Sequence, residues 1–482
     1  MNAEKIIKRI QKVYIQNKSP FVVGYSGGKD STAVLDLTLQ ALYNLYIEDI
    51  SIINKVTYIL TSDTLVENPF IISLIDSTFE SLEKLKDILN LKLVRVIPKI
   101  EESFWVSIIG KGYPLPLNRF RWCTRQLKVE PMKLIMNKLF DIKDGFISVL
   151  GIRFEESSSR KEKMDKNSIE FSDDMYRSVD DSNSIIFAPI NDIKTSDLWR
   201  FLLKRKKSIW GLDYAILYEM YWDTSKECPM ALESSMIDDS TLNCGSSRWG
   251  CWICPMSSTI WLDNMVNNGL NVLKPLADFR KWLIEGRDNR TNRYLGRHTL
   301  NKKNGEIKID IGLKGLTQLK RDKRDLTFNI YFQPKKGIRK KIVYIKEDTR
   351  FIESSSNSLP IIHYDQHKNL INSNLDILFS ESGNEIEYII DFNDQFWIPA
   401  MGPYTMQYRF EILFNLIKLQ NTIDGIELGT FGLKEIKIVN QEELDKIFDF
   451  WLLISKKINK YDYIKENIRK INKEIAHGNK AN

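Results

Sequence analysis

The amino-acid sequence predicts an α/β fold with a doubly wound parallel sheet in its first 206 residues. Apolar runs of strand length occur at residues 21–25, 55–61, 92–97 and 145–151. Apolar residues at helical spacing fill segments between these runs, and polar residues follow the ends of the strands. Strands that alternate with helices are typical of a parallel sheet covered by helices on both faces.

Three domains are predicted along the chain. Residues 1–206 form the sheet domain, residues 207–300 an insert rich in cysteine and tryptophan, and residues 301–482 an α+β region. The other elements expected in the first domain are helices at 3–17, from 33, at 69–89, from about 124 and at 195–206, and a strand at 185–190. In the last region we expect strands at 306–311, 326–332, 338–345 and 387–391, helices at 406–420 and 442–457, and a helical tail.

Residues 26–32, with the sequence SGGKDST, form a glycine loop between a predicted strand and a predicted helix. Such a loop directs backbone N–H groups and the positive end of the helix dipole towards an anion. Gly27 and Gly28 allow a close backbone approach, and Lys29 adds a positive charge, so we predict a polyphosphate site. Asp30 distinguishes the loop from a Walker A motif, and we expect this carboxylate to face Mg²⁺ or to cap the helix. An ordinary glycine turn is the alternative.

Two further strand ends carry residues that can meet a nucleotide. Asp63 follows the second strand, and at the carboxyl edge of the sheet it can contact the ribose or a metal ion. The alternative role for Asp63 is a helix N-cap. Gly151 ends the fourth strand and Arg153 follows it, where an arginine can hold a phosphate bidentately. Residues 155–184 are rich in polar side chains, and we expect either a mobile loop that closes over the site or a passive insertion.

The five cysteines indicate metal or redox chemistry rather than a disulfide framework. Cys251 and Cys254 form a C-x-x-C pair, and Cys244 lies seven residues earlier. The pair brings two sulfurs to one side of a turn, where they can bind one metal. A fourth ligand has to come from a distant segment, with Cys123 as the candidate and Cys228 as its competitor.

The surroundings of Cys123 in the sequence are strongly cationic. Its neighbours include Arg119, Arg121, Arg125 and Lys128. A thiol in such a setting forms the thiolate readily, so we expect the pKa of Cys123 to be lowered.

The net charge of +7 is modest, but its distribution is uneven. Residues 301–350 contain 15 Lys and Arg against 6 Asp and Glu, which is compatible with nucleic-acid binding or with a solvated β-hairpin face. No apolar run approaches the ~20 residues that a membrane span requires. The N-terminal segment is a basic amphipathic helix without the features of a signal peptide, so we expect a cytoplasmic protein without a membrane partner.

The motifs together resemble a known superfamily. Residues 26–31 resemble the PP-loop, Ser-Gly-Gly-x-Asp-Ser, of the ATP pyrophosphatases, and the GIRFEES sequence at 151–157 is similar to the phosphoadenylylsulfate (PAPS) reductase branch. The GKGYPLP and RWCT sequences within 110–128 and the Cys-x6-Cys-x-x-Cys spacing add a closer resemblance. This resemblance is to the DndC family, the sulfurtransferase subunits of bacterial DNA phosphorothioation systems, and it covers residues 1 to about 300.

The resemblance implies an adenine nucleotide α-hydrolase-like fold, ATP pyrophosphatase activity with Mg²⁺, and a 4Fe–4S cluster. The implied cluster ligands are Cys123, Cys244, Cys251 and Cys254. Catalytic roles are expected for Lys29, Asp30 and Arg153. The expected ATP-binding residues are Tyr25, Ser26, Gly27, Gly28, Lys29, Asp30, Ser31, Thr32, Asp63, Gly151 and Arg153. The implied partners are a cysteine desulfurase, other Dnd-type subunits and DNA.

The function that follows is an ATP-dependent sulfurtransferase that replaces a non-bridging oxygen of the DNA backbone with sulfur after adenylating the phosphate. A PAPS reductase-type enzyme is one alternative, but that enzyme relies on a cysteine near its C-terminus, and no cysteine follows Cys254. A tRNA thiolase with the same PP-loop is the second alternative. The third is a non-catalytic nucleotide-sensing subunit with a structural metal site.

Overall fold

The computed structural model describes the greater part of the chain. The described residues are 1–117, 120–140, 145–156, 167, 169, 174–177, 184–225, 250–256, 261–287, 289, 292–295, 297–301, 306–310, 317–321, 327–332, 339–344, 361–364, 389–392, 395–398, 401–423, 436–455 and 461–481. They form two compact units. Unit 1 contains residues 1–104, 116–280 and 422–438, and unit 2 contains residues 105–115, 281–421 and 439–482.

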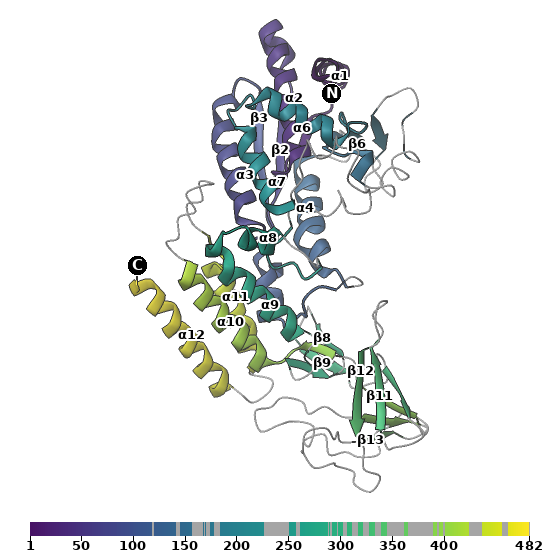
Figure 1. Ribbon diagram of the computed structural model, residues 1–482, viewed down its shortest axis with the longest axis vertical. Helices are drawn as coiled ribbons and strands as arrows, with labels where there is room; N and C mark the ends of the chain where they lie inside the picture. The colour runs from purple at the N-terminus through teal and green to yellow at the C-terminus, as the bar shows by residue number, and fades with distance from the viewer. Residues whose placement is uncertain are drawn as a thin grey trace. The chain divides into compact units, whose positions relative to one another are not determined.

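A six-stranded sheet forms the centre of unit 1 (Figure 1). Its strands are β1 (Phe21–Gly24), β2 (Thr57–Ser62), β3 (Leu91–Val96), β4 (Phe146–Val149), β5 (Met175–Arg177) and β6 (Ser184–Phe187). The spatial order is β3-β2-β1-β4-β6-β5, and every pair is parallel except β5 with β6. The predicted doubly wound α/β class is therefore confirmed, and β1 lies in the middle of the sheet beside β2 and β4.

Unit 1 also contains α-helices. They are α1 (Ala3–Gln16), α2 (Lys29–Glu48), α3 (Pro69–Leu82), α4 (Glu130–Leu139), α6 (Thr195–Arg205), α7 (Tyr214–Ser225) and α8 (Trp261–Asn267), while α9 (Lys274–Arg287) continues into unit 2. Most residues of α2 are buried, because α1 and α6 pack against it. On one face of the sheet, Met132, Ile135 and Met136 of α4 pack against Val22 and Leu60.

Two local differences from the sequence-based expectations concern the site. Helix α2 begins at Lys29 rather than at residue 33, so the polar residues of the glycine loop form its first turn. Strand β5 lies within residues 155–184, where a mobile loop was expected, because it pairs antiparallel with β6. The rest of that predicted loop, including Arg160, lies mostly outside the described residues.

Unit 2 combines antiparallel strands with helices. Its strands are β7 (Arg293–Leu295), β8 (Arg297–Asn301), β9 (Glu306–Asp310), β10 (Thr317–Arg321), β11 (Thr327–Phe332), β12 (Arg339–Tyr344), β13 (Ile361–Tyr364), β14 (Ile389–Phe392), β15 (Gln395–Ile398) and β16 (Met401–Tyr404). Its helices are α10 (Met406–Ile423, of which the last two residues belong to unit 1), α11 (Gln441–Ser455) and α12 (Tyr461–Ala481). The predicted hairpin strands β11 and β12 are antiparallel neighbours in a sheet of order β12-β11-β10-β15-β14-β13.

Residues 106–110 form a short π-helix that belongs to unit 2. The indole N–H of Trp451 donates to the carbonyl of Ile109 at 2.9 Å, and Arg409 donates to the carbonyl of Gly110 at 3.2 Å. Both side chains are buried, so these bonds satisfy carbonyls that the irregular helix leaves without regular partners.

Among the described residues, no helix combines the length and the apolar character needed to cross a membrane.

Candidate active site

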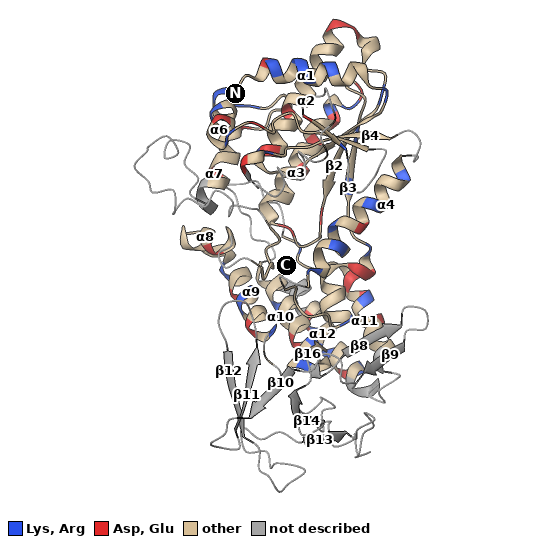
Figure 2. Cartoon of the chain, turned by 90° about the vertical axis from the view of Figure 1, so that its right-hand side faces the viewer, with Lys and Arg blue, Asp and Glu red and all other residues tan. Residues whose placement is uncertain are grey.

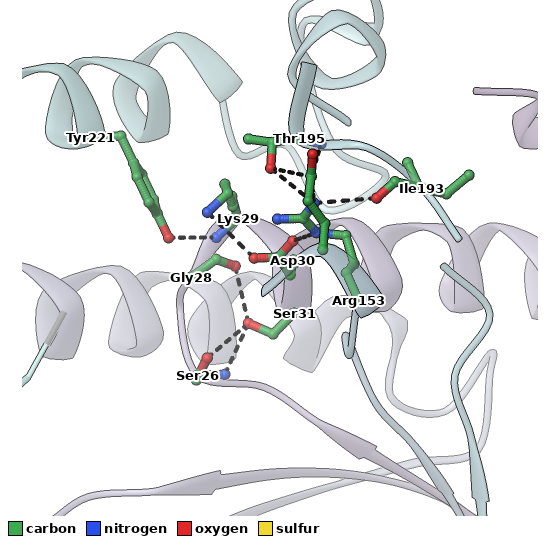
Figure 3. A network of polar contacts seen from close by, with 10 residues as sticks. Ser26, Gly28, Lys29, Asp30, Ser31, Arg153, Ile193, Thr195 and Tyr221 are labelled. Atoms are coloured by element: carbon green, nitrogen blue, oxygen red, sulfur yellow. Dashed lines mark hydrogen bonds and ion pairs between the residues drawn. The ribbon is translucent and has the colours of Figure 1, made fainter. Parts of the chain in front are cut away.

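The glycine loop after β1 is closed by its own hydroxyl groups (Figure 3). The Ser31 hydroxyl donates to the carbonyl of Gly28 at 3.0 Å and accepts the backbone N–H of Ser26 at 3.2 Å. The hydroxyls of Ser26 and Ser31 lie 3.0 Å apart. Gly27 has φ +72°, a left-handed conformation that side chains rarely adopt, so this turn requires glycine. The predicted loop therefore exists in a defined conformation.

Helix α2 starts at this loop without a side-chain cap. Gly28 occupies the N-cap position and offers no hydrogen-bonding side chain to the first turn. The N–H of Lys29 is instead bound by the hydroxyl of Tyr221, at 3.0 Å. The Lys29 ammonium lies 4.9 Å from the centre of the Tyr221 ring, and the lysine is only 5% exposed. A buried cation beside a helix N-terminus is an arrangement that favours a bound anion.

Arg153 connects the loop to the neighbouring strand ends. Its Nε is ion-paired with Asp30, and its Nη1 donates to Glu155 at 2.9 Å and to the Thr195 hydroxyl at 2.9 Å (Figure 3). Nη1 also lies 3.2 Å from the carbonyl of Ile193. The side chain is 1% exposed, so this arginine is engaged by protein groups. This arrangement favours a role in positioning Asp30 and Glu155 over direct contact with a phosphate.

Asp30 does not cap the helix, and that alternative was wrong. It is the second residue of α2, and its carboxylate is held by Arg153 on one side and by Lys29 at 3.6 Å on the other. The side chain is 14% exposed. The expected contact with Mg²⁺ stays a prediction.

Glu155 supplies the N-terminal cap of α6. Its Oε2 accepts the backbone N–H of Thr195 at 2.7 Å and the Thr195 hydroxyl at 2.8 Å. Burial opposes ionisation of Glu155, but the bonds from Thr195 and the charge of Arg153 outweigh it and lower its pKa. The cap of α6 thus comes from a carboxylate in the loop after β4 and not from the side chain of Lys194 at the N-cap position.

Gly151 allows the loop after β4 to approach the phosphate loop closely. A Cβ at this position would lie 2.7 Å from the carbonyl carbon of Asp30 and 2.8 Å from the nitrogen of Ser31. The backbone of the first turn of α2 cannot move aside as a flexible side chain would. Gly151 is therefore required for packing against the loop, and any contact that it makes with a nucleotide remains a prediction.

Two of the predicted ATP-binding residues lie beneath the loop. Tyr25 is 2% exposed, and its hydroxyl lies 3.0 Å from the hydroxyl of Thr78. Burial raises the pKa of Tyr25 to about 12. Thr32 is fully buried. These side chains support the loop from the protein interior.

Asp63 stands at the carboxyl end of β2, as the sequence predicted. Its Oδ1 accepts the N–H of Leu65 at 2.8 Å, and its Oδ2 lies 3.9 Å from Arg95. Burial raises the pKa of Asp63, although Arg95 acts in the opposite direction. The alternative role as a helix N-cap was wrong, because the side chain of Asn68 caps α3 by accepting the N–H of Phe70.

Three free thiols gather beside the loop after β2, and we call Cys123, Cys251 and Cys254 the thiol group. The sulfur of Cys251 lies 3.5 Å from the hydroxyl of Thr64. The thiols of Cys123 and Cys254 are close enough for the charge on one to affect the other. Cys123 directly precedes a π-helical turn, Thr124–Val129, where the sequence predicted the start of a helix.

Backbone bonds fix the C-x-x-C turn in place. The N–H of Trp252 donates to the carbonyl of Val66 at 3.2 Å, and the N–H of Cys254 donates to the carbonyl of Cys251 at 3.0 Å. The guanidinium of Arg280 donates twice to the carbonyl of Cys254, at 3.1 and 2.9 Å. The turn is therefore attached to the loop that begins at Asp63.

The expected low pKa of Cys123 was wrong. Burial raises the pKa of its thiol, and the nearby Cys254 acts in the same direction. The cations of the sequence do not offset this effect, because Lys128 is paired with Glu67 at 2.8 Å and the exposed Arg125 with Glu130 at 3.0 Å. Arg119 lies outside the described residues.

The donor set of the thiol group suits a metal cluster in its chemistry, since thiolates are the ligands of iron–sulfur centres. Within the described residues, no group of three or more His, Cys, Asp or Glu side chains is arranged to hold a metal ion. Cys244, the fourth predicted ligand, and Cys228, its competitor for a place in the set, both lie outside those residues. The four-cysteine assignment thus stays a prediction.

Sequence reasoning missed three residues that shape this site. Tyr221 is 192 residues from the loop residue that it contacts, and nothing in its local sequence sets it apart from the other tyrosines of α7. Thr64 and Glu67 lie in the segment after β2, and their only signal was proximity to the predicted site residue Asp63.

Comparisons with known proteins define the class of the first unit. Residues 20–256 match the family model of the phosphoadenosine phosphosulfate reductase domain. Over 246 residues the chain is 27% identical to an uncharacterized protein of Methanocaldococcus jannaschii, a match that covers 51% of this chain and 38% of that relative. The chain thus spans well under half the length of this relative.

Two solved structures show a weak overall likeness. One is the PAPS reductase of Candida auris in a phosphate complex, with a TM-score of 0.29, 13% identity and coverage of 45% of this chain and 85% of that chain. Another is a tRNA thiolase of Methanococcus maripaludis with its 4Fe–4S cluster, with a TM-score of 0.25, 14% identity and coverage of 58% and 79%.

Residues 20–256 therefore form a PAPS reductase-like domain of the PP-loop superfamily. Its α/β fold is built around the mostly parallel six-stranded sheet, with the PP-loop at residues 26–31 between β1 and α2.

Proposed function

We propose that this chain is an ATP-dependent sulfurtransferase that introduces phosphorothioate into DNA. One observation carries the proposal. The PP-loop follows β1, the thiol group is attached to the loop that follows β2, and these two strands are parallel neighbours. Their carboxyl ends share one edge of the sheet, so a nucleotide loop and a cysteine-rich site meet on one side of the same domain.

In the proposed reaction, the PP-loop N–H groups and Lys29 bind the β- and γ-phosphates together with Mg²⁺. A non-bridging oxygen of the DNA phosphate attacks the α-phosphorus of ATP, and the bond between the α- and β-phosphates breaks. Lys29 stabilises the charge that develops on the departing pyrophosphate, as fixed cations do in phosphoryl transfer. Asp30, positioned by Arg153, would hold the metal ion.

Sulfur transfer completes the proposed cycle. The desulfurase supplies sulfur as a persulfide, and a thiol reductant releases it as sulfide while the thiols are oxidised to a disulfide. The sulfide attacks the adenylated DNA phosphorus, its proton is released, and AMP leaves with the oxygen that it received. The net change is the replacement of one non-bridging oxygen with sulfur, without a change of oxidation state at phosphorus.

Cys123, Cys244, Cys251 and Cys254 are the residues that would hold a 4Fe–4S cluster. Such a cluster would supply a site for binding sulfide or for electron transfer. The chain's own contribution is to keep Cys251 and Cys254 beside the loop after β2 through Thr64, Val66 and Arg280.

The proposed partners are a cysteine desulfurase as the source of sulfur, other Dnd-type subunits, and DNA. The surplus of nine positive charges in residues 301–350 is suited to the DNA backbone.

The test is a reconstitution without oxygen. The full chain is incubated with ATP, Mg²⁺, a cysteine desulfurase, cysteine, a thiol reductant and duplex DNA, and the nuclease-digested DNA is analysed by mass spectrometry for phosphorothioate dinucleotides. We expect these dinucleotides with the wild type and none with Lys29→Ala or Cys251→Ser. A parallel incubation with tRNA serves as the counter-test, because thiolated bases in tRNA with unmodified DNA would favour a tRNA thiolase instead.

A further inference from the structure

The hydroxyl of Tyr221 occupies a position that a phosphate oxygen takes at a helix N-terminus. It accepts the N–H of Lys29, the first N–H of α2, at 3.0 Å. Phosphates bind helix N-termini through these first N–H groups, which have no partner within the helix. A phosphate oxygen and the tyrosine hydroxyl therefore compete for the same donor.

The Tyr221 ring also lies against the Lys29 side chain. The ammonium is 4.9 Å from the ring centre, a distance at which the cation and the face of the ring attract each other. Tyr221 thus engages both the backbone donor and the charge with which this residue would bind a polyphosphate (Figure 3). A Cβ on Gly28 would lie 3.3 Å from the same hydroxyl, which shows how closely the tyrosine approaches the loop.

Packing against a residue of α6 holds Tyr221 in this position. It is 3% exposed, and its ring packs edge-to-face against Trp199 with the centres 5.2 Å apart. Trp199 is fully buried in α6, the helix whose first residue, Thr195, is bonded to Arg153 and Glu155. The same helix therefore supports the contact of Tyr221 with Lys29 and the network that holds Asp30.

We propose that Tyr221 is a displaceable gate of the PP-loop, whose hydroxyl takes the place of a phosphate oxygen before the substrate binds and is displaced by the polyphosphate of the substrate. The inference rests on the proposed function only in that the loop binds a polyphosphate, and it is independent of DNA and of sulfur. A ligand that binds here must break the hydrogen bond between the Tyr221 hydroxyl and the Lys29 N–H, which costs free energy. The gate therefore lowers the affinity for small anions and favours ligands with enough phosphate contacts to replace it.

The test measures binding of inorganic pyrophosphate with Mg²⁺ to the full chain by isothermal titration calorimetry. Tyr221→Phe removes the competing hydroxyl and keeps the ring, so we expect pyrophosphate to bind about fivefold more tightly, the value of one net hydrogen bond. Tyr218→Phe is the matched control, because Tyr218 packs against the same Trp199 from the same helix, with the ring centres 5.6 Å apart. We expect its affinity to equal that of the wild type.

The other possible results distinguish a failure of the proposed gate from a failure of the PP-loop assignment. Equal or weaker pyrophosphate binding by Tyr221→Phe, with binding by the wild type that is lost in Lys29→Ala, would overturn the gate and leave the PP-loop assignment intact. Weaker binding in particular would mean that the hydroxyl helps to hold the phosphate. No binding of pyrophosphate or of a non-hydrolysable ATP analogue by the wild type or by either tyrosine variant would overturn both proposals.

Discussion

The PP-loop and the thiol group lie at the ends of neighbouring strands, but they are stabilised in different ways. The PP-loop is a polar network of short bonds, in which hydroxyls close the turn and a buried arginine links two carboxylates. The thiol group is held mainly through hydrogen bonds to backbone carbonyls, with one hydroxyl near one sulfur. The loop is therefore sensitive to the loss of a single charge, whereas the thiol group depends on the placement of the segments that carry it.

The two regions also differ in how far their charged side chains are exposed to water. At the PP-loop, Lys29 and Arg153 are buried beside Asp30, so removing one member leaves an uncompensated charge with little access to water. Beside the thiol group, Lys128 is half-exposed in its ion pair with Glu67. Solvent screens that pair more strongly, and its loss is less costly.

The largest effect is expected from Arg153→Met, which keeps the length of the side chain and removes its charge. Asp30 and Glu155 then lose their common partner, and we expect a loss of about 3 kcal/mol in the free energy of unfolding. Urea denaturation measures this change. The control is Arg200→Met, because Arg200 pairs with Asp197 at the surface, where the effect should stay below about 0.5 kcal/mol. Equal effects of the two substitutions would contradict the comparison.

Gly151→Ala tests whether the PP-loop depends on close backbone packing. The added Cβ meets the backbone of Asp30 and Ser31 at 2.7 to 2.8 Å, and we expect a destabilisation of about 2 kcal/mol together with weaker pyrophosphate binding. In the control, Gly24→Ala, the Cβ meets the end of the flexible Leu150 side chain at 2.8 Å. Its effect should be clearly smaller, and a larger effect of Gly24→Ala would refute this account of the packing.

Glu67→Gln tests the half-exposed ion pair beside the thiol group. The loss of its charge removes the partner of Lys128, and we expect a decrease of about 1 kcal/mol in the free energy of unfolding. The matched control is Glu83→Gln at the exposed pair of Glu83 with Lys86, for which we expect almost no change. A decrease as large as that of Arg153→Met would remove the distinction between the two regions.

The smallest effect is a pH dependence at Asp63, which stands between the two regions. Burial raises its pKa in the folded state, so its stabilising contribution is complete below the unfolded pKa of about 4 and is lost as the pH rises through the folded pKa. We therefore expect Asp63→Asn to gain stability relative to the wild type as the pH rises from about 4 to neutrality. Urea denaturation at several pH values checks this, and the opposite trend would show that the pairing with Arg95 dominates.

The PP-loop could be predicted from the sequence because its residues are contiguous and its glycines and hydroxyls are typical of an anion site. The strands around it could be predicted for the same reason, since their apolar runs are local. Tyr221 could not be predicted, because its contact with Lys29 depends on the packing of α7 against α6. The environment of Cys123 was predicted wrongly, because the sequence shows which cations are near but not which carboxylates neutralise them.

The charged side chains show the same limit of prediction from sequence. Figure 2 shows Lys and Arg on α1 and α4, two helices that cover the sheet of unit 1. The sequence predicted the amphipathic character of α1, and its buried residues Ile6, Ile10, Val13 and Tyr14 follow from that pattern. It did not predict the partners of single charges, such as the pairing of Arg9 with Asp174. Helical periodicity determines the buried face of a helix, whereas individual ion pairs depend on the tertiary structure.

The central claim is that the PP-loop supports cleavage of ATP between its α- and β-phosphates. The most direct measurement is the product analysis of radiolabelled ATP incubated with the full chain, Mg²⁺ and DNA, with Lys29→Ala as the inactive control. The account predicts AMP and pyrophosphate in equal amounts, formed faster when DNA is present. Formation of ADP and inorganic phosphate, or turnover that persists in Lys29→Ala, would contradict it.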